Sequence, residues 1–79
     1  MNILLEKQAR KYLLRLHDPD QSRLEEAIDK LQQLDGNIKH LSGTKNEYRL
    51  RVGDYRILFE INDDTITVTK IGPRGDVYK

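Results

Sequence analysis

The stretch YRLRVGDYRILFEI, residues 48–61, decides the fold, because apolar residues alternate with other residues on both sides of a Gly-Asp pair. Such alternation is typical of a strand with one buried face, and Gly-Asp favours a two-residue hairpin turn. With this pair as the turn, we expect Leu50 to lie opposite Ile57 on the apolar face. Arg51 then lies opposite Arg56 on the other face, where facing like charges weaken a hairpin.

Two interpretations of the arginines are open. In the first, the side chains of Arg49, Arg51 and Arg56 extend into water, and Glu47 or Glu60 partly neutralises them. In the second, the arginines converge on a phosphate, which guanidinium groups bind through charge-assisted, bidentate hydrogen bonds. The pattern alone does not decide between them.

Two short amphipathic helices are expected before the hairpin, because apolar residues recur there at helical spacing. The two stripes are Leu5, Ala9, Tyr12, Leu13 and Leu16, and then Leu24, Ala27, Ile28, Leu31 and Leu34. A short extended segment, Asn2–Leu4, can precede the first helix. Asp18 can cap the second helix, with Pro19 at its first position and Gly36 as the C-cap glycine.

The remaining elements are a connection and a third strand. Residues 36–46 read as a polar connection, and Thr65–Ile71 is rich in β-branched residues and ends before Gly72-Pro73. The predicted fold is α+β: a short N-terminal strand, an antiparallel two-helix hairpin, and a three-stranded antiparallel sheet with the helices on one face. At 79 residues, we expect one domain over residues 1–79.

Composition excludes several classes of site. The chain has no cysteine, so neither disulfides nor thiolate zinc ligands are available. The start MNILLEK leaves no apolar region of a signal peptide, and no apolar run approaches a membrane span, so we expect a cytoplasmic protein. The net charge is only +1, but residues 39–56 are locally basic. Two explanations are open: an anionic partner bound at one site, or an ordinary solvated face, which composition alone favours.

The hairpin followed by ITVTKIGPRGDVYK, residues 66–79, resembles the RelE/ParE superfamily of bacterial and archaeal toxins. Members often carry a Y-R-[IL]-R-x-G-[DN]-Y-R-x-x-[FY] stretch, then a strand ending in G-H-R and a short D-V-Y tail. EKQARKYLLRL, residues 6–16, is similar to the first helix of the family. The resemblance spans almost the whole chain, and it implies the RelE-like fold of microbial ribonucleases.

The resemblance implies a toxin that cleaves mRNA in the ribosomal A site, with the RelE branch favoured. In that reaction the 2′-hydroxyl attacks the adjacent phosphate, giving a 2′,3′-cyclic phosphate and a free 5′-hydroxyl. Carried over by motif, Arg56 holds the phosphate, Arg74 stabilises the transition state, and Tyr78 stacks on a base or moves protons. Arg49 and Arg51 stand where the best-known RelE toxin has lysines, and are expected to bind RNA.

Departures from the family pattern concern proton transfer. Arginine stays protonated in proteins, so the arginines are poor general bases, and Pro73 replaces the histidine of G-H-R. Lys45, counted among the expected RNA-binding residues, is one of the nearest proton acceptors, together with Glu47 and Tyr78. His40 reaches the site only if the 36–46 segment curls over it.

The expected partners are a cognate antitoxin, the ribosome and mRNA, with no membrane, metal or cofactor. Two alternatives remain open. One is a ParE-like toxin, which shares the fold but poisons DNA gyrase and needs no nuclease site. The other is a weakly active or inactive relative that serves as an antitoxin-binding module.

Overall fold

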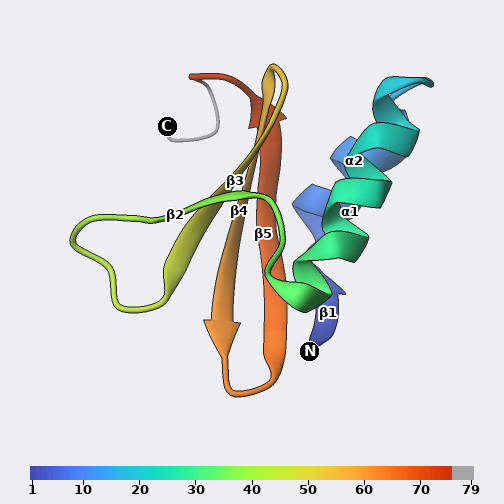
Figure 1. The fold of residues 1–79 in the computed structure, drawn as a ribbon. Helices are drawn as coiled ribbons and strands as arrows, with labels where there is room; N and C mark the ends of the chain where they lie inside the picture. Colours follow the sequence, from blue (N-terminus) through green and yellow to red (C-terminus); the bar gives the residue numbers. More distant parts are fainter. Residues whose placement is uncertain (76–79) are drawn as a thin grey trace.

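The structure is a computed structural model that describes residues 1–75, in which two helices pack against one face of a five-stranded sheet (Figure 1). The α+β class expected from the sequence is confirmed. In chain order the elements are β1 (Asn2–Leu5), α1 (Lys7–Arg15), α2 (Asp20–Lys30), a 3-10 turn (Leu31–Gln33), β2 (Asn37–His40), β3 (Glu47–Val52), β4 (Tyr55–Asn62) and β5 (Thr65–Pro73).

The sheet contains two strands beyond the three that were expected, in the order β1-β5-β4-β3-β2. β1 pairs in parallel with β5, and β2 pairs antiparallel with β3. The expectation that residues 36–46 form only a polar connection is therefore wrong. Ile38 pairs with Leu50 and packs against the core, so one apolar contact holds an otherwise polar edge strand in place.

The core lies between the inner face of the sheet and the two helices. Ala9 of α1 and Leu24 and Ile28 of α2 are buried, as the helical stripes predict. The other fully or nearly fully buried apolar residues are Leu31, Leu50, Ile57, Phe59, Ile66, Val68 and Ile71. The helices cover only this inner face, so within residues 1–75 no helix lies on the outer face of the sheet.

The start of α2 differs from the expectation by one position. The helix begins at Asp20 with Pro19 as its N-cap. Oδ1 of Asp18 accepts hydrogen bonds from the backbone N–H of Ser22 at 3.0 Å and from its hydroxyl at 2.6 Å. These two bonds lower the pKa of Asp18. Asp18 thus supplies the capping oxygen from just outside the helix.

The C-cap prediction is wrong. The residue in the left-handed conformation after the 3-10 turn is Leu34, with φ of 54°. Gly36 has φ of 138° and serves a different purpose: a Cβ built at this position would lie 2.8 Å from Cδ1 of Leu50. Gly36 is needed where the chain passes close to β3 on its way into β2.

A β-bulge at Thr69 of β5 reverses the faces of the sheet on which the following side chains lie. Leu58 pairs with Lys70, whereas the next residue of β4 pairs with Val68, so Thr69 is an extra residue. One extra residue moves everything after it to the opposite face. Val68 therefore faces the core, Lys70 faces outward, and Ile71 returns to the core.

A side chain continues the pairing of β5 where β1 ends. The last link of β1 is the Glu6 N–H, which donates to the carbonyl of Val68 at 2.9 Å. Beyond it, Gln8 of α1 donates from Nε2 to the carbonyl of Ile71 at 3.2 Å, and its Oε1 accepts from the Ile71 N–H at 3.0 Å. The amide thus substitutes for a strand partner.

No helix within residues 1–75 is long and apolar enough to cross a membrane.

Candidate functional site

The β3–β4 hairpin has the register that the sequence predicts. Val52 pairs with Tyr55 around the turn, and Arg51 pairs with Arg56. Gly53 has φ of 56°, the positive value that the first position of a tight hairpin turn requires. The outer side of this hairpin, carrying Arg49, Arg51 and Arg56, is called the arginine face below.

The two opposed arginines have different environments. Arg51 is exposed, whereas only 5% of Arg56 is accessible. Nη1 of Arg56 donates to the carbonyl of Tyr55 at 3.0 Å and to that of Gly53 at 3.3 Å. The Arg56 guanidinium is therefore anchored to the backbone of the turn and does not splay into water. This anchoring fixes the direction of one of the two guanidinium groups.

Arg49 is held only in part. Its Nη2 donates to Oδ1 of Asn37 in β2 at 3.3 Å, and its Nε is buried with no hydrogen-bond partner. An unsatisfied buried donor costs free energy that a bound acceptor would recover. Glu47 and Glu60 pair with each other one row further along the sheet. Within residues 1–75 neither glutamate forms an ion pair with an arginine.

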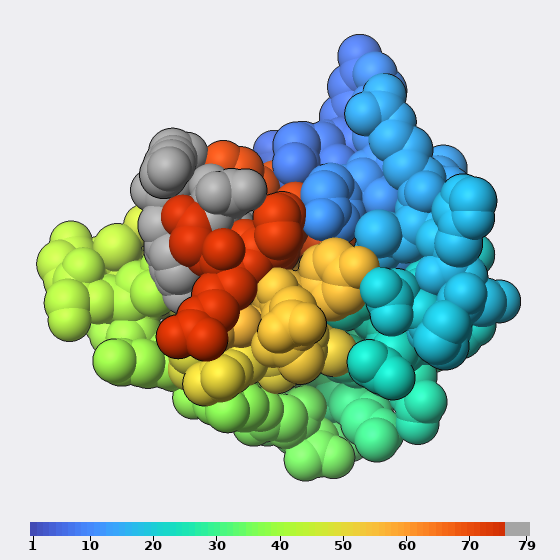
Figure 2. Space-filling model, turned by 90° about the horizontal axis from the view of Figure 1, so that it is seen from above, coloured from blue at the N-terminus to red at the C-terminus, as the bar shows by residue number. Residues whose placement is uncertain are grey.

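The end of β5 reaches the same end of the hairpin. The backbone N–H of Arg74 donates to the carbonyl of Asp54 at 2.8 Å, and Arg74 is exposed. In Figure 2 the red segment that follows β5 lies against the yellow turn between β3 and β4. The chain thus brings Arg74 to the end of the sheet that carries Arg51 and Arg56. Tyr78 lies outside the described residues.

Other candidates lie away from this end. Lys45 precedes β3, at the opposite end of that strand from Arg51. The carbonyl of Lys45 contacts Nε2 of His40 at 3.3 Å. His40 packs edge-on against Tyr48, with ring centroids 5.1 Å apart. Neither Lys45 nor His40 joins the arginine face at its hairpin end.

Two lysines that sequence reasoning did not select lie on the outer face. Lys39 pairs with Arg49, and Lys70 pairs with Leu58, which itself pairs with Arg49. Lys39 lies in residues 36–46, which the sequence predicted to be a connection, whereas the structure places this residue in β2. Lys70 and Val68 are two residues apart, so a regular strand would place both side chains on the same face. The bulge at Thr69 turns Lys70 to the outer face instead. The sequence indicates the bulge through Ile71, an apolar residue at an odd position, because the apolar residues Ile66 and Val68 before it stand at even positions.

The hairpin is also attached to the helices. The hydroxyl of Tyr55 donates to Oδ2 of Asp20 at 2.6 Å. This bond, with a smaller contribution from burial, raises the pKa of Tyr55 to about 12, because ionising the phenol would place two negative charges together. The contact joins the first turn of α2 to the hairpin end of the sheet and so supports the frame around Arg56.

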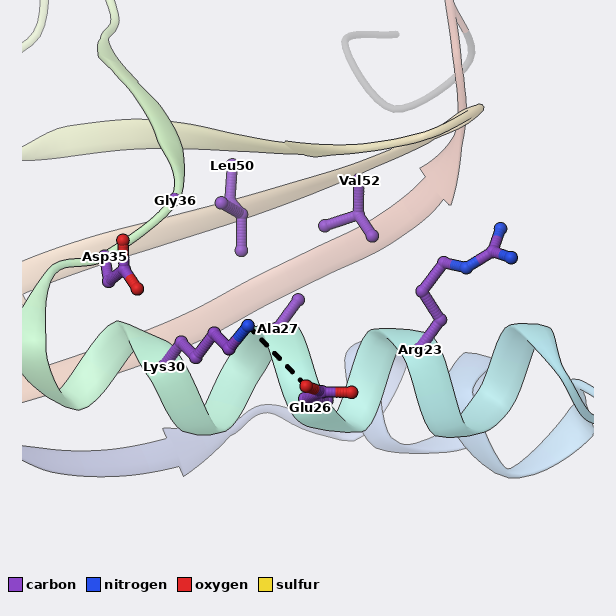
Figure 3. Close-up of a pocket in the computed structure, with 8 residues that line it drawn as sticks. All are labelled: Arg23, Glu26, Ala27, Lys30, Asp35, Gly36, Leu50 and Val52. Atoms are coloured by element: carbon purple, nitrogen blue, oxygen red, sulfur yellow. Dashed lines mark ion pairs between the residues drawn. The ribbon is translucent and has the colours of Figure 1, made fainter.

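Two hollows lie among the helices rather than on the arginine face. The larger, of about 280 Å³, lies between α2 and β3, and Figure 3 shows Leu50 and Val52 pointing from β3 toward the helix. Charged residues line its rim, including the ion pair of Lys30 and Glu26 at 3.5 Å. The other, of about 200 Å³, is lined by Leu5, Leu13, Glu25, Ile28 and Asp29. Neither includes a residue of the arginine face.

No group of three or more potential metal ligands gathers within the part of the chain that the structure describes. The chemistry that this part of the molecule offers is positive charge: two arginines on paired strands, a third at the entry to the tail, and further cations on the outer face. Such an arrangement suits a phosphate better than a neutral ligand.

Comparison with known proteins gives similarity to toxins of the RelE type. The chain is similar to Toxin RelE3 from Methanocaldococcus jannaschii, with 44% identity over 48 residues that cover 61% of this chain and 54% of that protein. The chain therefore matches about half the length of this curated relative.

Solved structures match over nearly the full chain. The RelB–RelE antitoxin–toxin complex from Methanococcus jannaschii gives a TM-score of 0.79 at 32% identity, covering 95% of this chain and 94% of that one. The archaeal RelE–RelB complex from Pyrococcus horikoshii OT3 gives 0.77 at 30% identity, covering 96% and 97%. The isolated Escherichia coli RelE toxin, at 19% identity, covers 98% and 89% with a TM-score of 0.78 and shares the fold.

The family model for the ParE toxin of the type II toxin–antitoxin system parDE matches residues 3–78. This match covers both helices, the hairpin and the approach of β5 to the arginine face. The chain belongs to this toxin family, within the RelE/ParE superfamily.

Proposed function

We propose that this chain is a toxin that cleaves mRNA in the ribosomal A site and is neutralised by a cognate antitoxin. The observation that carries the proposal is the pairing of Arg51 with Arg56 at the sheet end that Arg74 also reaches. Three guanidinium groups at one end of a sheet are more than stability requires, since facing like charges weaken a hairpin.

The reaction needs positive charge where the phosphorane develops. The ribose 2′-oxygen bonds to phosphorus, the bond from phosphorus to the 5′-oxygen breaks, and the products are a 2′,3′-cyclic phosphate and a 5′-hydroxyl. Arg56 is suited to hold the phosphate, because its two backbone contacts fix the guanidinium before substrate arrives. Arg74 and Arg51, which are exposed, can approach the same group from either side.

Proton transfer is assigned by position. Lys45 and Glu47 lie toward the far end of β3, so they suit contacts to a neighbouring nucleotide better than proton transfer at the Arg56 phosphate. Tyr78, carried over from the family motif, is the proposed residue for stacking or proton transfer. The proposal thus gives the arginines the phosphate and gives the tail tyrosine the proton.

The antitoxin is proposed from the relatives. The two archaeal complexes pair a RelE toxin with RelB, and both toxins are at least 30% identical to this chain. A partner of this kind would gain affinity from an acidic segment laid over the arginine face. It would also stabilise a small domain by binding only its folded form.

The proposal is tested by expressing the chain without a partner and mapping mRNA 5′ ends on ribosomes. Wild-type protein should give cuts at fixed codon positions. Arg56→Ala and Arg74→Ala should each reduce cleavage by about 10²–10³-fold, the usual effect of removing one donor that stabilises developing charge. Arg10→Ala, on the exposed side of α1, is the matched control and should cut normally.

A second candidate, poisoning of DNA gyrase, follows from the ParE family match. Growth arrest with intact mRNA and inhibited gyrase would support it and refute the nuclease. If cells grow normally while antitoxin binding persists, the chain is a binding module without toxic activity.

A further inference from the structure

We infer that the hydrogen bond from the Tyr55 hydroxyl to Asp20 positions the guanidinium of Arg56, so that α2 controls the geometry of the phosphate site. The inference rests on the proposed function and deepens it, because Arg56 is the residue proposed to hold the phosphate. Tyr55 and Asp20 act through Arg56 and are positioning residues, with no contact to RNA assigned to them.

Tyr55 contacts both helices with its side chain and Arg56 with its backbone. Its hydroxyl donates to Oδ2 of Asp20, in the first turn of α2, at 2.6 Å. Its ring packs edge-on against Tyr12 of α1, with ring centroids 6.4 Å apart. Its backbone carbonyl accepts from Nη1 of Arg56 at 3.0 Å. One residue therefore joins the two helices to the guanidinium.

The guanidinium of Arg56 follows the backbone of residues 53–55. The two carbonyls that accept from Nη1 belong to Gly53 and Tyr55, which stand three residues and one residue before the arginine. Because only 5% of Arg56 is accessible, the side chain has little room to turn independently of these acceptors. A shift of the turn therefore moves the guanidinium with it.

The turn is held from two sides. From β5, the backbone N–H of Arg74 donates to the carbonyl of Asp54 at 2.8 Å. From α2, Asp20 holds the hydroxyl of Tyr55. The end of a hairpin opens more readily than the centre of a sheet, so removal of either attachment loosens residues 53–55.

A hydrogen bond that serves stability alone would have a different signature. Its loss would lower the melting temperature and leave the orientation of Arg56 unchanged in the folded protein. The geometry predicts more than this, because the carbonyl that holds Arg56 belongs to the residue whose hydroxyl is held by α2. The stability of the protein and the orientation of the guanidinium must therefore be measured separately.

The first test measures rotation about the Nε–Cζ bond of Arg56 by NMR, under conditions in which thermal melts show every variant to be folded. Tyr55→Phe and Asp20→Ala should accelerate this rotation by about twofold to tenfold, the effect of weakening one hydrogen bond. Asp20→Asn keeps an oxygen that accepts from the hydroxyl, so its rotation rate should match that of the wild type. The inference is overturned if Tyr55→Phe and Asp20→Ala leave the rotation rate unchanged.

Two variants serve as matched controls. Tyr48→Phe makes the same chemical change on β3, at the opposite end of the hairpin from Tyr55. Ile28→Val removes a methyl group from the buried face of α2, beside Leu13 of α1, and should lower the melting temperature. Both should leave the rotation of Arg56 unchanged. If Ile28→Val accelerates the rotation as much as Tyr55→Phe does, loss of stability explains the effect and the inference is overturned.

Ribosome cleavage tests whether Tyr55 acts through Arg56. Tyr55→Phe should lower kcat by about 10- to 10²-fold with little change in KM, because a displacement of about 1 Å can cost about 10²-fold and the loss lies in the transition state. In an Arg56→Ala background the same substitution should cause no further loss, since the residue that it positions is gone. Equal losses in both backgrounds would show that Tyr55 acts independently of Arg56 and would overturn the inference.

The two tests distinguish failure of this inference from failure of the proposed function. If Arg56→Ala abolishes codon-positioned cuts but Tyr55→Phe cuts as the wild type does, the nuclease stands and the inference is refuted. If the wild type never cuts, while Tyr55→Phe and Asp20→Ala accelerate the rotation of Arg56 and the controls do not, the positioning stands and the nuclease is refuted.

Discussion

Replacing Gln8 with alanine should loosen the attachment of α1 to the end of β5. The substitution removes both amide contacts to Ile71 and leaves its backbone N–H and carbonyl without this partner. A typical hydrogen bond contributes about 0.5–1.5 kcal/mol, and a buried group left unpaired costs about 1–3 kcal/mol. Because Gln8 is exposed and water can enter in its place, we expect a loss of about 2 kcal/mol.

For a domain of this size, about 2 kcal/mol corresponds to a fall of about 8–16 °C in melting temperature. The fall can be followed by circular dichroism during heating, with urea titration as a second measure. Gln32→Ala, at an exposed glutamine of the 3-10 turn, is the control and should change the melting temperature little.

Gln8→Glu sharpens the same prediction. At neutral pH its carboxylate still accepts from the Ile71 N–H, but it faces the Ile71 carbonyl without a proton to donate. Protonation restores the donor, so the pKa of this glutamate should be higher in the folded than in the unfolded state. The Gln8→Glu variant should therefore lose stability as pH rises from the glutamate pKa of the unfolded state through that of the folded state. If Gln8→Ala melts like the wild type and Gln8→Glu shows no such pH dependence, the amide does not hold β5.

Three further predictions concern Tyr55 in the hairpin, Asp18 before α2 and Gly36 before β2. Tyr55→Phe removes the bond to Asp20 and should cost about 1–2 kcal/mol of stability near neutral pH. Because folding raises this phenol pKa to about 12, the wild-type advantage should persist below pH 10 and disappear as pH rises toward 12, as paired urea titrations would reveal. Asp18→Ala should lower the melting temperature by removing the cap on Ser22; since the pKa of Asp18 is lowered, the wild-type advantage should fade in acid, below about pH 4. Gly36→Ala, with φ of 138° and no room for a Cβ, should destabilise the protein by more than 1 kcal/mol in a thermal melt, and an unchanged melting temperature would contradict the geometry.

The hairpin was predictable because two independent signals agree there. Alternation sets which residues face the core, and the Gly-Asp pair sets the loop length, so the pairing of Arg51 with Arg56 follows from residues 48–61 alone. The burial of Arg56 was not predictable in this way. Its guanidinium donates to two carbonyls of the hairpin, and backbone groups carry no signature in the sequence.

The missed elements depend on distant partners. β2 has one apolar inward residue, Ile38, and it is a strand because β3 offers it an edge. The outward direction of Lys70 depends on the bulge at Thr69, which shifts the pairing between β4 and β5. Local periodicity reports a residue's own neighbours, so contacts of this kind fall outside what it can indicate.

The parallel pairing of β1 with β5 determines when the molecule can be completed during synthesis. Asn2 pairs with Thr65, and Gln8 contacts Ile71, across a separation of 63 residues in the chain in each case. A nascent chain that already contains both helices and the hairpin still lacks the strand that joins its first residues to the sheet. The same late strand delivers Arg74 to the turn. Closure of the sheet and assembly of the arginine cluster are therefore one event, which during synthesis can occur only after β5 has emerged from the ribosome.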